Sequence, residues 1–337
     1  MAFDVSIIKG KTVYDIVHAR VSECIRIVKD AYLAHGESRT VNPDSHFLRF
    51  SDNPGARIIA LPAFLGRESN VAGIKWIGSF PENIKRGFPR ASAVLVLNDA
   101  TTGYPFAILE SSVVSAARTA ASAVLGAEWL NQGEKHTRTL GIVGTGLIAR
   151  YVYRFLMDTG WRIDHVRLFD AGPGEAEAFR ANVVRAGAHT SVSAASDLPS
   201  LLRESSMIVL TTTAGTPHIL EPDLLAHCPV VLHLSLRDLS PEILLGAYNI
   251  VDDIEHVMKA NTSPHLVEQQ VGHRRFVTGT LAELMTGRCA VGRDKPAIFS
   301  PFGLGVLDLA VGKWVYDEAV AAGDDLRLTD FFFDLTR

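Results

Sequence analysis

The sequence predicts an α/β protein with two parts: a Rossmann-type, doubly wound parallel sheet, and an α+β domain with a mostly antiparallel sheet. A short apolar strand at 140–143 runs into a glycine-rich turn and then into helical spacing, which predicts the Rossmann part. Strands and helices alternate after it, as in a parallel sheet. Before it, short alternating segments and a hairpin indicate the antiparallel sheet.

The glycine-rich turn contains the residue types of a dinucleotide-binding loop. Gly144, Gly146 and Ala149 form the pattern G-x-G-x-x-A. Gly144 allows a tight turn, and Gly146 lets a pyrophosphate approach the backbone because glycine has no Cβ. The amide groups and the dipole at the start of the next helix favour a phosphate. The alternative is an ordinary strand–turn–helix that binds no cofactor.

Asp170 ends the next apolar strand and supports the cofactor interpretation. It lies 26 residues after Gly144, slightly beyond the usual spacing of about 20. A carboxylate at this point accepts hydrogen bonds from both hydroxyls of the adenosine ribose. The residues that follow include no arginine for a 2′-phosphate, so we predict NAD rather than NADP. The alternative role for Asp170 is a helix cap.

Composition and charge exclude several classes of protein. The chain has 337 residues, of which 47% are hydrophobic and 21% charged, enough for two domains. Its net charge of −4 and its scattered lysines and arginines do not suggest a nucleic-acid partner. It contains no apolar run of the roughly 18 residues that a membrane span needs. The N-terminus lacks the pattern of a signal peptide.

Cysteine and histidine spacing gives two further expectations. Cys24, Cys228 and Cys289 are odd in number and far apart, which indicates reduced thiols and a cytoplasmic protein. The histidines, such as His256, His265 and His273, lack the spacing of a metal site, and we expect surface or loop positions for them. No metal is predicted.

The first half of the chain predicts the α+β domain. Apolar spacing predicts one core-facing helix over 13–34. Strands are predicted at 46–50, 56–64, 71–79, 94–98 and 104–109. The last two pair as a hairpin around the turn-rich loop 99–103. A long helix of small residues, 111–130, is expected to run toward the second domain, followed by a polar connection at 133–138.

The second half predicts the parallel sheet. Strands are expected at 140–143, 166–169, 191–192, 207–210, 230–234 and 249–251. Three of them end in polar residues, at 211–213, 235–238 and 252–253. Ligands bind such sheets at the carboxyl ends of the strands, so these are candidate site segments. After Pro301 another small-residue helix is expected to return across the domain junction.

Lys75 is a candidate catalytic residue. It lies between Ile74 and Trp76 on a predicted strand, so it faces the opposite side of the sheet from them. In a cleft, desolvation would lower its pKa toward neutrality and suit it for acid–base work or for orienting a carboxylate. The alternative is a solvated lysine on the polar face of a half-buried strand.

Arg118 and Asp238 are the other two candidates. Arg118 is the one charged residue between Glu110 and Glu128, so it needs an anionic partner. That partner is either a substrate carboxylate, which guanidinium binds bidentately, or an internal salt bridge. Asp238 follows a strand at the expected rim of the sheet, where it either takes a proton or caps the next helix.

Seven stretches together resemble the ornithine cyclodeaminase/μ-crystallin family. They are AGIKW at 72–76, LNDATTGYPFAILE at 97–110, SAARTAASA at 115–123, GIVGTGLIAR at 141–150, the threonines at 211–213, Asp238, and FGLGVLDLA at 302–310. The resemblance runs from about residue 10 to about residue 320. It implies a substrate-binding and dimerisation domain, 1–125 with 304–337, and an NAD-binding Rossmann domain, 126–303. A homodimer is implied by the resemblance alone.

The resemblance also implies roles for site residues. Lys75 is the catalytic lysine, Asp238 the catalytic aspartate, and Arg118 binds the substrate carboxylate. Arg39 lies where some members carry another carboxylate-binding arginine. Arg90, like Arg86, could meet a second carboxylate or be exposed on the surface. The residues predicted to bind NAD are Gly144, Thr145, Gly146, Leu147, Ile148, Asp170, Thr119, Thr211, Thr212, Thr213, Ser235 and Gly303.

One departure from the family pattern indicates a branch. True cyclodeaminases have a stretch like DCPGKTEL at the aspartate, whereas this chain has RDLSPEIL. That version, together with IKWIGSFPENIKRGFPRASAVLVLND at 74–99, resembles the SbnB-like branch of 2,3-diaminopropionate biosynthesis for siderophores and peptide antibiotics. It implies NAD-dependent cleavage of N-(1-amino-1-carboxy-2-ethyl)-L-glutamate to L-2,3-diaminopropionate, 2-oxoglutarate and NADH. The alternatives are ornithine cyclodeaminase, alanine dehydrogenase, ketimine reductase, or a non-catalytic ligand binder like some μ-crystallins.

Overall fold

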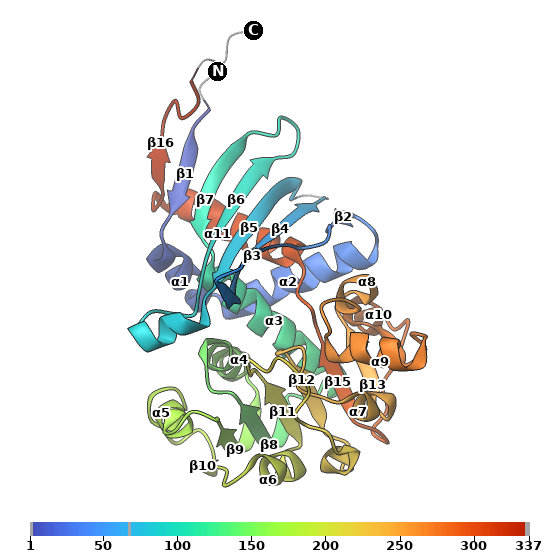
Figure 1. Ribbon diagram of the computed structural model, residues 1–337. Coiled ribbons are helices and arrows are strands. Elements are labelled where there is room, and N and C mark those ends of the chain that lie inside the picture. The colour runs from blue at the N-terminus through green and yellow to red at the C-terminus, as the bar shows by residue number, and fades with distance from the viewer. Residues whose placement is uncertain (1–2, 67–68, 334–337) are drawn as a thin grey trace. The chain divides into compact units, whose positions relative to one another are not determined.

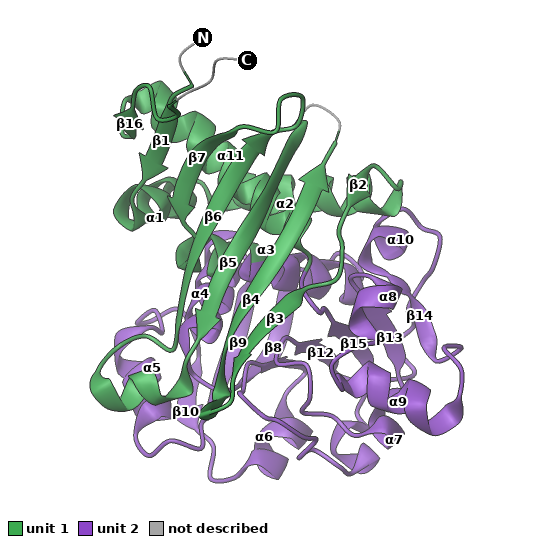
Figure 2. Cartoon of the chain, turned by 45° about the horizontal axis from the view of Figure 1, so that its top comes forward, with its two compact units in different colours: residues 1–118, 304–337 green, residues 119–303 purple. Residues whose placement is uncertain are grey.

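A computed structural model describes residues 3–66 and 69–333 of the chain. The chain divides into two compact units, which Figure 2 shows in different colours. Unit 1 comprises residues 1–118 and 304–337, and unit 2 comprises residues 119–303. The first boundary falls inside the helix α3 (Ser112–Leu130), so this one helix contributes residues to both units.

Unit 1 contains a mostly antiparallel sheet in the order β16-β1-β7-β6-β5-β4-β2, with β3 paired to β4. Its strands are β1 (Val5–Ile8), β2 (Thr40–Val41), β3 (His46–Phe50), β4 (Asn53–Leu65), β5 (Val71–Ser79), β6 (Ala91–Asp99), β7 (Pro105–Glu110) and β16 (Leu326–Leu328). The predicted hairpin is confirmed, because β6 and β7 pair antiparallel. The pair β1–β7 is parallel.

Three helices of unit 1 pack beside this sheet. They are α1 (Gly10–Ala19), α2 (Val21–Gly36) and α11 (Gly305–Ala322); a short 3₁₀ helix, η1 (Pro81–Arg86), joins β5 to β6. Helix α11 lies against β4, β5, β6 and α2 (Figure 1). The two halves of unit 1 therefore share a core, although they are far apart in sequence.

The prediction of a single helix over 13–34 is wrong, because the helix is interrupted at Arg20. Arg20 has φ −138° and ψ 56°, outside the helical region, and it separates α1 from α2. Both helices bury the same apolar row, which includes Val13, Val17, Val21 and Val28. The spacing continues across the break, so periodicity alone does not reveal it.

Unit 2 contains an entirely parallel sheet in the order β10-β9-β8-β11-β12-β15-β13-β14. Its strands are β8 (His136–Val143), β9 (Arg162–Phe169), β10 (Ser191–Ala194), β11 (Met207–Leu210), β12 (Val230–His233), β13 (Tyr248–Val251), β14 (Val277–Thr280) and β15 (Ala297–Ser300). The chain runs outward from β8 and then returns to β11 on its other side. This reversal creates a switch point, where open parallel sheets bind ligands.

Helices connect the strands of unit 2 and cover its core. They are α4 (Leu147–Asp158), α5 (Glu175–Asn182), α6 (Leu198–Glu204), η2 (Pro222–Leu225), α7 (Pro241–Leu245), α8 (Ile254–Val257), α9 (Ser263–Val271) and α10 (Leu281–Met285). The predicted fold class is confirmed. Strands β1, β2, β14, β15 and β16 were not predicted, although β11 and β12, which are as short as β15, were. Strand β8 also begins at His136, inside the predicted polar connection.

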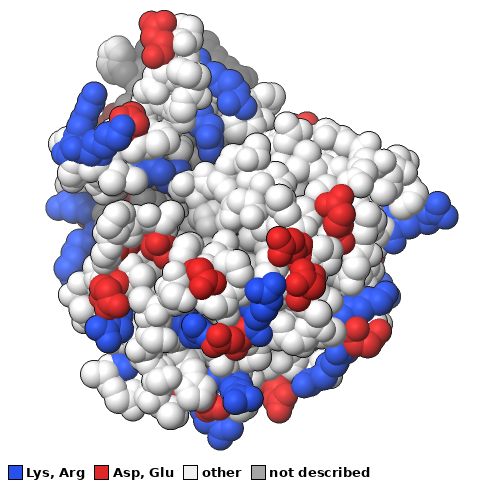
Figure 3. All heavy atoms as spheres, turned by 60° about the horizontal axis from the view of Figure 1, so that its bottom comes forward, with Lys and Arg blue, Asp and Glu red and all other residues white. Residues whose placement is uncertain are grey.

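The structure bears on three predictions, which concern membrane-spanning helices, the distribution of charge and the position of His256. No helix within residues 3–66 and 69–333 is long and apolar enough to cross a bilayer. The face displayed in Figure 3 carries acidic and basic side chains side by side. The surface or loop position predicted for His256 is wrong: it is 8% exposed in α8, with Nδ1 3.0 Å from Asp253.

Candidate active site

Lys75 is a buried cation of unit 1. Strand β5 alternates, so Trp76 is 42% exposed, whereas Lys75 is 2% exposed. The solvated alternative for this lysine is therefore wrong. Its Nζ donates to Oδ2 of Asp308 at 2.7 Å and to Oγ of Ser115 at 3.2 Å. A buried ammonium needs such partners, because desolvation penalises an isolated charge.

Asp308 joins Lys75 to Arg118. Its Oδ1 accepts from Nε of Arg118 at 3.2 Å, and it lies in the first turn of α11, where the helix dipole favours a carboxylate. The carboxylate is fully buried. Arg118, from α3, has 13% of its side chain exposed. The salt bridge that the sequence left open for Arg118 is thus present, and it engages Nε.

The surroundings of Lys75 favour a lysine that can lose its proton. Burial lowers the pKa of Lys75 to about 8, because the charged form is desolvated. The charge of Asp308 opposes this shift, and the charge of Arg118 adds to it. An amine with a pKa near neutrality can both accept and donate a proton in a catalytic cycle.

The two other arginines predicted to bind substrate have their contacts elsewhere in unit 1. Arg39 lies 3.3 Å from Glu37, and 58% of its side chain is exposed. Arg90 donates to Oγ of Ser79 at 2.6 Å, and burial together with the charge of Arg57 lowers its pKa. The contacts seen for these arginines do not include Lys75 or Asp308.

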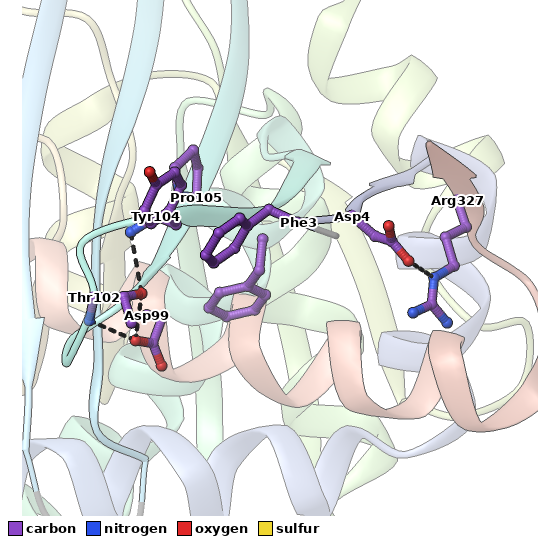
Figure 4. A pocket seen from close by; sticks show the side chains of 8 residues that line it. Phe3, Asp4, Asp99, Thr102, Tyr104, Pro105 and Arg327 are labelled. Atoms are coloured by element: carbon purple, nitrogen blue, oxygen red, sulfur yellow. Dashed lines mark hydrogen bonds and ion pairs between the residues drawn. The ribbon is translucent and has the colours of Figure 1, made fainter. Parts of the chain in front are cut away.

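A cavity of about 340 Å³ in unit 1 lies at the turn of the β6–β7 hairpin. Figure 4 shows Phe3 and Tyr104 beside it; their rings stack with centroids 4.0 Å apart. Asp4 and Arg327 form an ion pair of 2.8 Å at its edge. None of its lining residues belongs to the group around Lys75, so it is not part of the candidate site.

The glycine loop of unit 2 lies at the switch point between β8 and β11. Gly144 has φ +82°, and a Cβ there would lie 2.8 Å from the carbonyl oxygen of Thr211. Glycine is therefore required for both conformation and space. The hydroxyl of Thr211 donates to the carbonyl of Gly144 at 2.6 Å. The carboxylate of Asp170 accepts from the amide of Thr145 at 2.7 Å and from that of Gly172 at 2.8 Å.

Gly146 provides a test of whether a dinucleotide fits. A Cβ on Gly146 would meet no atom within 4 Å. Its φ of −75° suits any residue, so the protein's own packing does not require a glycine here. Gly146 is the N-cap of α4 and has no side chain with which to cap this helix end. Open space in front of free helix amides is what a pyrophosphate needs, so the cradle fits NAD.

A second cluster of buried polar groups surrounds Asp238. Its carboxylate accepts hydrogen bonds from the hydroxyls of Thr212 and Ser235. Nε2 of His218 lies 3.0 Å from Oδ1, and Nε2 of His233 lies 3.2 Å from Oδ2. Thr212 and His218 lie in the loop after β11, whereas His233 ends β12 and Ser235 follows it, so Asp238 joins the carboxyl ends of these two strands.

The charge of Asp238 is fixed by these contacts. Burial alone would raise the pKa of its carboxyl, but hydrogen bonds from His218, His233 and Ser235 and the charge of His233 outweigh burial and lower it well below its usual range. Asp238 itself is fully buried. The group is therefore an ionised carboxylate whose oxygens are already engaged.

Asp252 holds the segment that carries Gly303. Its carboxylate accepts from the amides of Phe302 at 2.9 Å and Gly303 at 2.6 Å. Burial raises the pKa of Asp252 despite these bonds. Gly303 has φ +101°, which favours glycine. Thr119 lies in α3, directly after Arg118, at the first position of unit 2.

Sequence reasoning missed three residues of these clusters: Asp308, His218 and His233. Asp308 was available as the one charge in FGLGVLDLA, where a lone acid among small apolar residues needs a partner, as Arg118 does. The two histidines offered no comparable signal.

Together, these features define an α/β protein with a dinucleotide-binding parallel sheet and a buried lysine–carboxylate–arginine group in its other unit. The chain belongs to the ornithine cyclodeaminase/mu-crystallin family, whose family model matches residues 11–323. The family predicted from the sequence is confirmed.

Named relatives and a solved structure extend over most of the chain. The chain is 28% identical over 301 residues to N-((2S)-2-amino-2-carboxyethyl)-L-glutamate dehydrogenase of Staphylococcus aureus, covering 86% of this chain and 88% of the relative. It is 25% identical over 309 residues to alanine dehydrogenase of Archaeoglobus fulgidus, covering 89% and 91%. The fold is similar to that of Thermococcus litoralis Delta(1)-pyrroline-2-carboxylate reductase in complex with NADH and L-proline. The TM-score is 0.85 at 21% identity, over 95% and 98% of the two chains. The two sequence relatives are named as dehydrogenases of amino acids and the solved reductase is in complex with NADH, in agreement with the predicted class of oxidoreductase.

Proposed function

We propose that the protein is an NAD-dependent oxidoreductase that cleaves N-(1-amino-1-carboxy-2-ethyl)-L-glutamate oxidatively. The products would be L-2,3-diaminopropionate, 2-oxoglutarate and NADH. The observation that carries the class of reaction is buried Lys75, with its lowered pKa and its bonds to Asp308 and Ser115. The choice of substrate rests on the similarity to the staphylococcal dehydrogenase.

The reaction consumes water and releases one proton. When bound, NAD⁺ supplies the oxidant that takes a hydride from the glutamate Cα. The substrate C–N bond becomes an iminium, water adds to its carbon, and the C–N bond then breaks to give the keto acid and the amine. The protein has to hold the reacting carbon in place, neutralise carboxylates and move protons.

The residues of unit 1 fit substrate binding. Arg118 brings a guanidinium to the group, and its orientation is fixed by Asp308 through Nε. Lys75 exchanges a proton with the substrate nitrogen, which its lowered pKa allows at neutral pH. Arg39 and Arg90 are proposed as alternatives for the second carboxylate, because they lie at opposite ends of the β4–β5 pair.

The residues of unit 2 fit the cofactor. Gly146 and the start of α4, including Leu147 and Ile148, would hold the pyrophosphate. Asp170 would accept the ribose hydroxyls. The remaining assignments are Thr119, Gly144, Thr145, Thr211, Thr212, Thr213, Ser235 and Gly303.

The experiment follows NADH absorbance with NAD⁺ and the conjugate, with ornithine and alanine as controls. NADH formation with the conjugate alone, and 2-oxoglutarate in the mass spectrum, would support the proposal. Turnover of alanine instead would favour the second candidate, an alanine dehydrogenase, which the similarity to the archaeal enzyme supports. Ornithine turnover without net NADH would indicate a cyclodeaminase.

A further inference from the structure

His218 is held by hydrogen bonds to Asp238, yet part of its side chain is exposed. It lies in the loop after β11, and its amide donates to the carbonyl of Asp238 at 3.0 Å. The next residue, Ile219, pairs with Leu239 in a parallel bridge. These contacts hold the loop against the segment that carries Asp238. The backbone position from which the imidazole extends is therefore fixed.

The side-chain contact determines which ring nitrogen carries the proton. Nε2 of His218 lies 3.0 Å from Oδ1 of Asp238. An ionised carboxylate only accepts, so Nε2 must be the donor. A neutral imidazole then has its lone pair on Nδ1. Within the described part of the chain, Nδ1 of His218 has no hydrogen-bond partner, and 36% of the side chain is exposed.

Asp238 has the opposite properties. Its side chain is 0% exposed, and hydroxyl or imidazole donors engage both of its oxygens. A carboxylate in this state cannot reach a substrate without losing those bonds. It can, however, orient an imidazole and stabilise its protonated form, as a buried aspartate does behind a catalytic histidine.

We propose that His218 is the catalytic acid–base residue of unit 2, and that Asp238 is the residue that positions it. The inference deepens the proposed function and rests on it. His218 belongs to the carboxyl-end loop that begins with Thr211–Thr213, at the switch point where parallel sheets bind ligands. The fixed Nε2 bond aims the basic Nδ1 away from Asp238.

Nδ1 of His218 carries each proton of the hydrolysis. Water adds to the iminium carbon while Nδ1 takes one water proton, which gives a carbinolamine and an imidazolium. The imidazolium then protonates the amine nitrogen. As the C–N bond breaks, Nδ1 takes the hydroxyl proton and the carbonyl forms. The imidazolium finally releases one proton to solvent, which is the proton of the overall reaction.

The main test is His218→Gln. The glutamine amide can replace Nε2 as the donor to Asp238, but it has no base at the position of Nδ1. We expect kcat to fall by about 10²- to 10⁴-fold, with the Kd for NAD⁺ and the Tm unchanged. His227→Gln is the matched control, because His227 is another exposed histidine of unit 2 that bonds a backbone carbonyl through Nε2. A His218→Gln enzyme that keeps at least a third of the wild-type kcat would overturn the inference.

A second variant separates chemistry from a structural role. His218→Ala leaves a gap that free imidazole can fill, so added imidazole should restore part of kcat. A histidine that only fastens the loop would not give this rescue, and absence of rescue in a folded His218→Ala enzyme would count against the proposal.

A last measurement does not depend on the substrate. If the wild type oxidises none of the tested compounds, the proposed function fails, and ¹⁵N NMR of labelled histidine then decides the inference. A proton on Nε2 of His218 with a bare Nδ1 would support it. A proton on Nδ1 would overturn it, because no base would then face outward.

Discussion

The two units each bury a charged group, with opposite consequences. In unit 1, Lys75 has one carboxylate and one competing guanidinium as neighbours, and burial lowers its pKa to about 8. In unit 2, the carboxylate of Asp238 accepts hydrogen bonds from hydroxyl and imidazole groups, and its pKa falls well below the usual range. Burial opposes the charged form in both places, so the number and sign of the partners decide the outcome. The lysine can therefore change protonation near neutral pH, whereas the aspartate stays ionised.

The largest expected effect comes from removing the group that can titrate. Lys75→Ala should lower turnover by about 10³-fold or more, since general acid–base groups contribute about 10²- to 10⁴-fold. The Kd for NAD⁺ should change by less than about twofold, because the contacts of Lys75 lie in unit 1. Steady-state kinetics and fluorescence titration with NAD⁺ measure both.

Lys85→Ala is the control for this change. Lys85 is an exposed lysine of the same unit, with 75% of its side chain in solvent. It should keep full activity. Turnover by Lys75→Ala at the wild-type rate would remove this lysine from the mechanism.

The second effect tests the carboxylate that balances the lysine. Asp308→Asn leaves two cationic side chains close together without their shared anion, and breaking a buried ion pair costs about 3–5 kcal/mol. We expect a drop of that order in the free energy of unfolding in urea, together with reduced turnover. Asp317→Asn, which removes an exposed pair with Lys313, should change stability by less than about 1 kcal/mol. If Asp308→Asn and Asp317→Asn lower the free energy of unfolding equally, Asp308 does not balance the charges of Lys75 and Arg118.

The third effect sharpens the assignment of unit 2. Gly146→Val places its side chain in open space, so the Tm of the free protein should stay close to wild type, while the Kd for NAD⁺ should rise at least about tenfold, or about 1.4 kcal/mol. Gly144→Ala should instead destabilise the fold, because a left-handed non-glycine residue costs about 1–2 kcal/mol and its Cβ would meet Thr211. Calorimetry and NAD⁺ titration distinguish them. Unchanged NAD⁺ affinity in Gly146→Val would rule out this cradle.

The last effect is a pH dependence of stability. The pKa of Lys75 is lowered in the folded state, so between about 8 and 10.5 the unfolded chain binds more protons at this residue. Lys75 therefore favours the folded state most above its unfolded pKa, and this contribution is lost as the pH falls toward about 8. Lys75→Met should remove this slope. If the free energy of unfolding changes with pH in the same way for both proteins between about pH 8 and 10.5, that result would contradict the lowered pKa of Lys75.

The sequence predicted some parts of both regions. Alternation on a strand placed Lys75 on the face opposite Trp76, because the side-chain period of a strand is two. The glycine turn was readable because a positive φ at Gly144 requires that residue. Strand boundaries were close wherever the apolar run was long enough, as for β5.

Other parts depend on contacts that no local pattern encodes. Asp308 meets Lys75 across 233 residues of sequence. Of the two histidines around Asp238, His218 comes from an irregular loop, where no period predicts which way a side chain faces, and His233 ends the buried strand β12. The four-residue strand β15 lies between β12 and β13 and was not predicted, although the equally short strands β11 and β12 were. Long-range pairing and irregular backbone therefore set the limit of the sequence reading.

The most direct test of the contrast between the two units is an NMR titration of the lysine ammonium groups in ¹⁵N-labelled protein. Lys75, assigned by its loss in Lys75→Met, should titrate with a pKa of about 8. A lysine side chain in a model peptide titrates at about 10.4. If Lys75 titrates at that reference value, burial in unit 1 does not prepare it to exchange a proton at neutral pH, and the proposed chemistry loses its base.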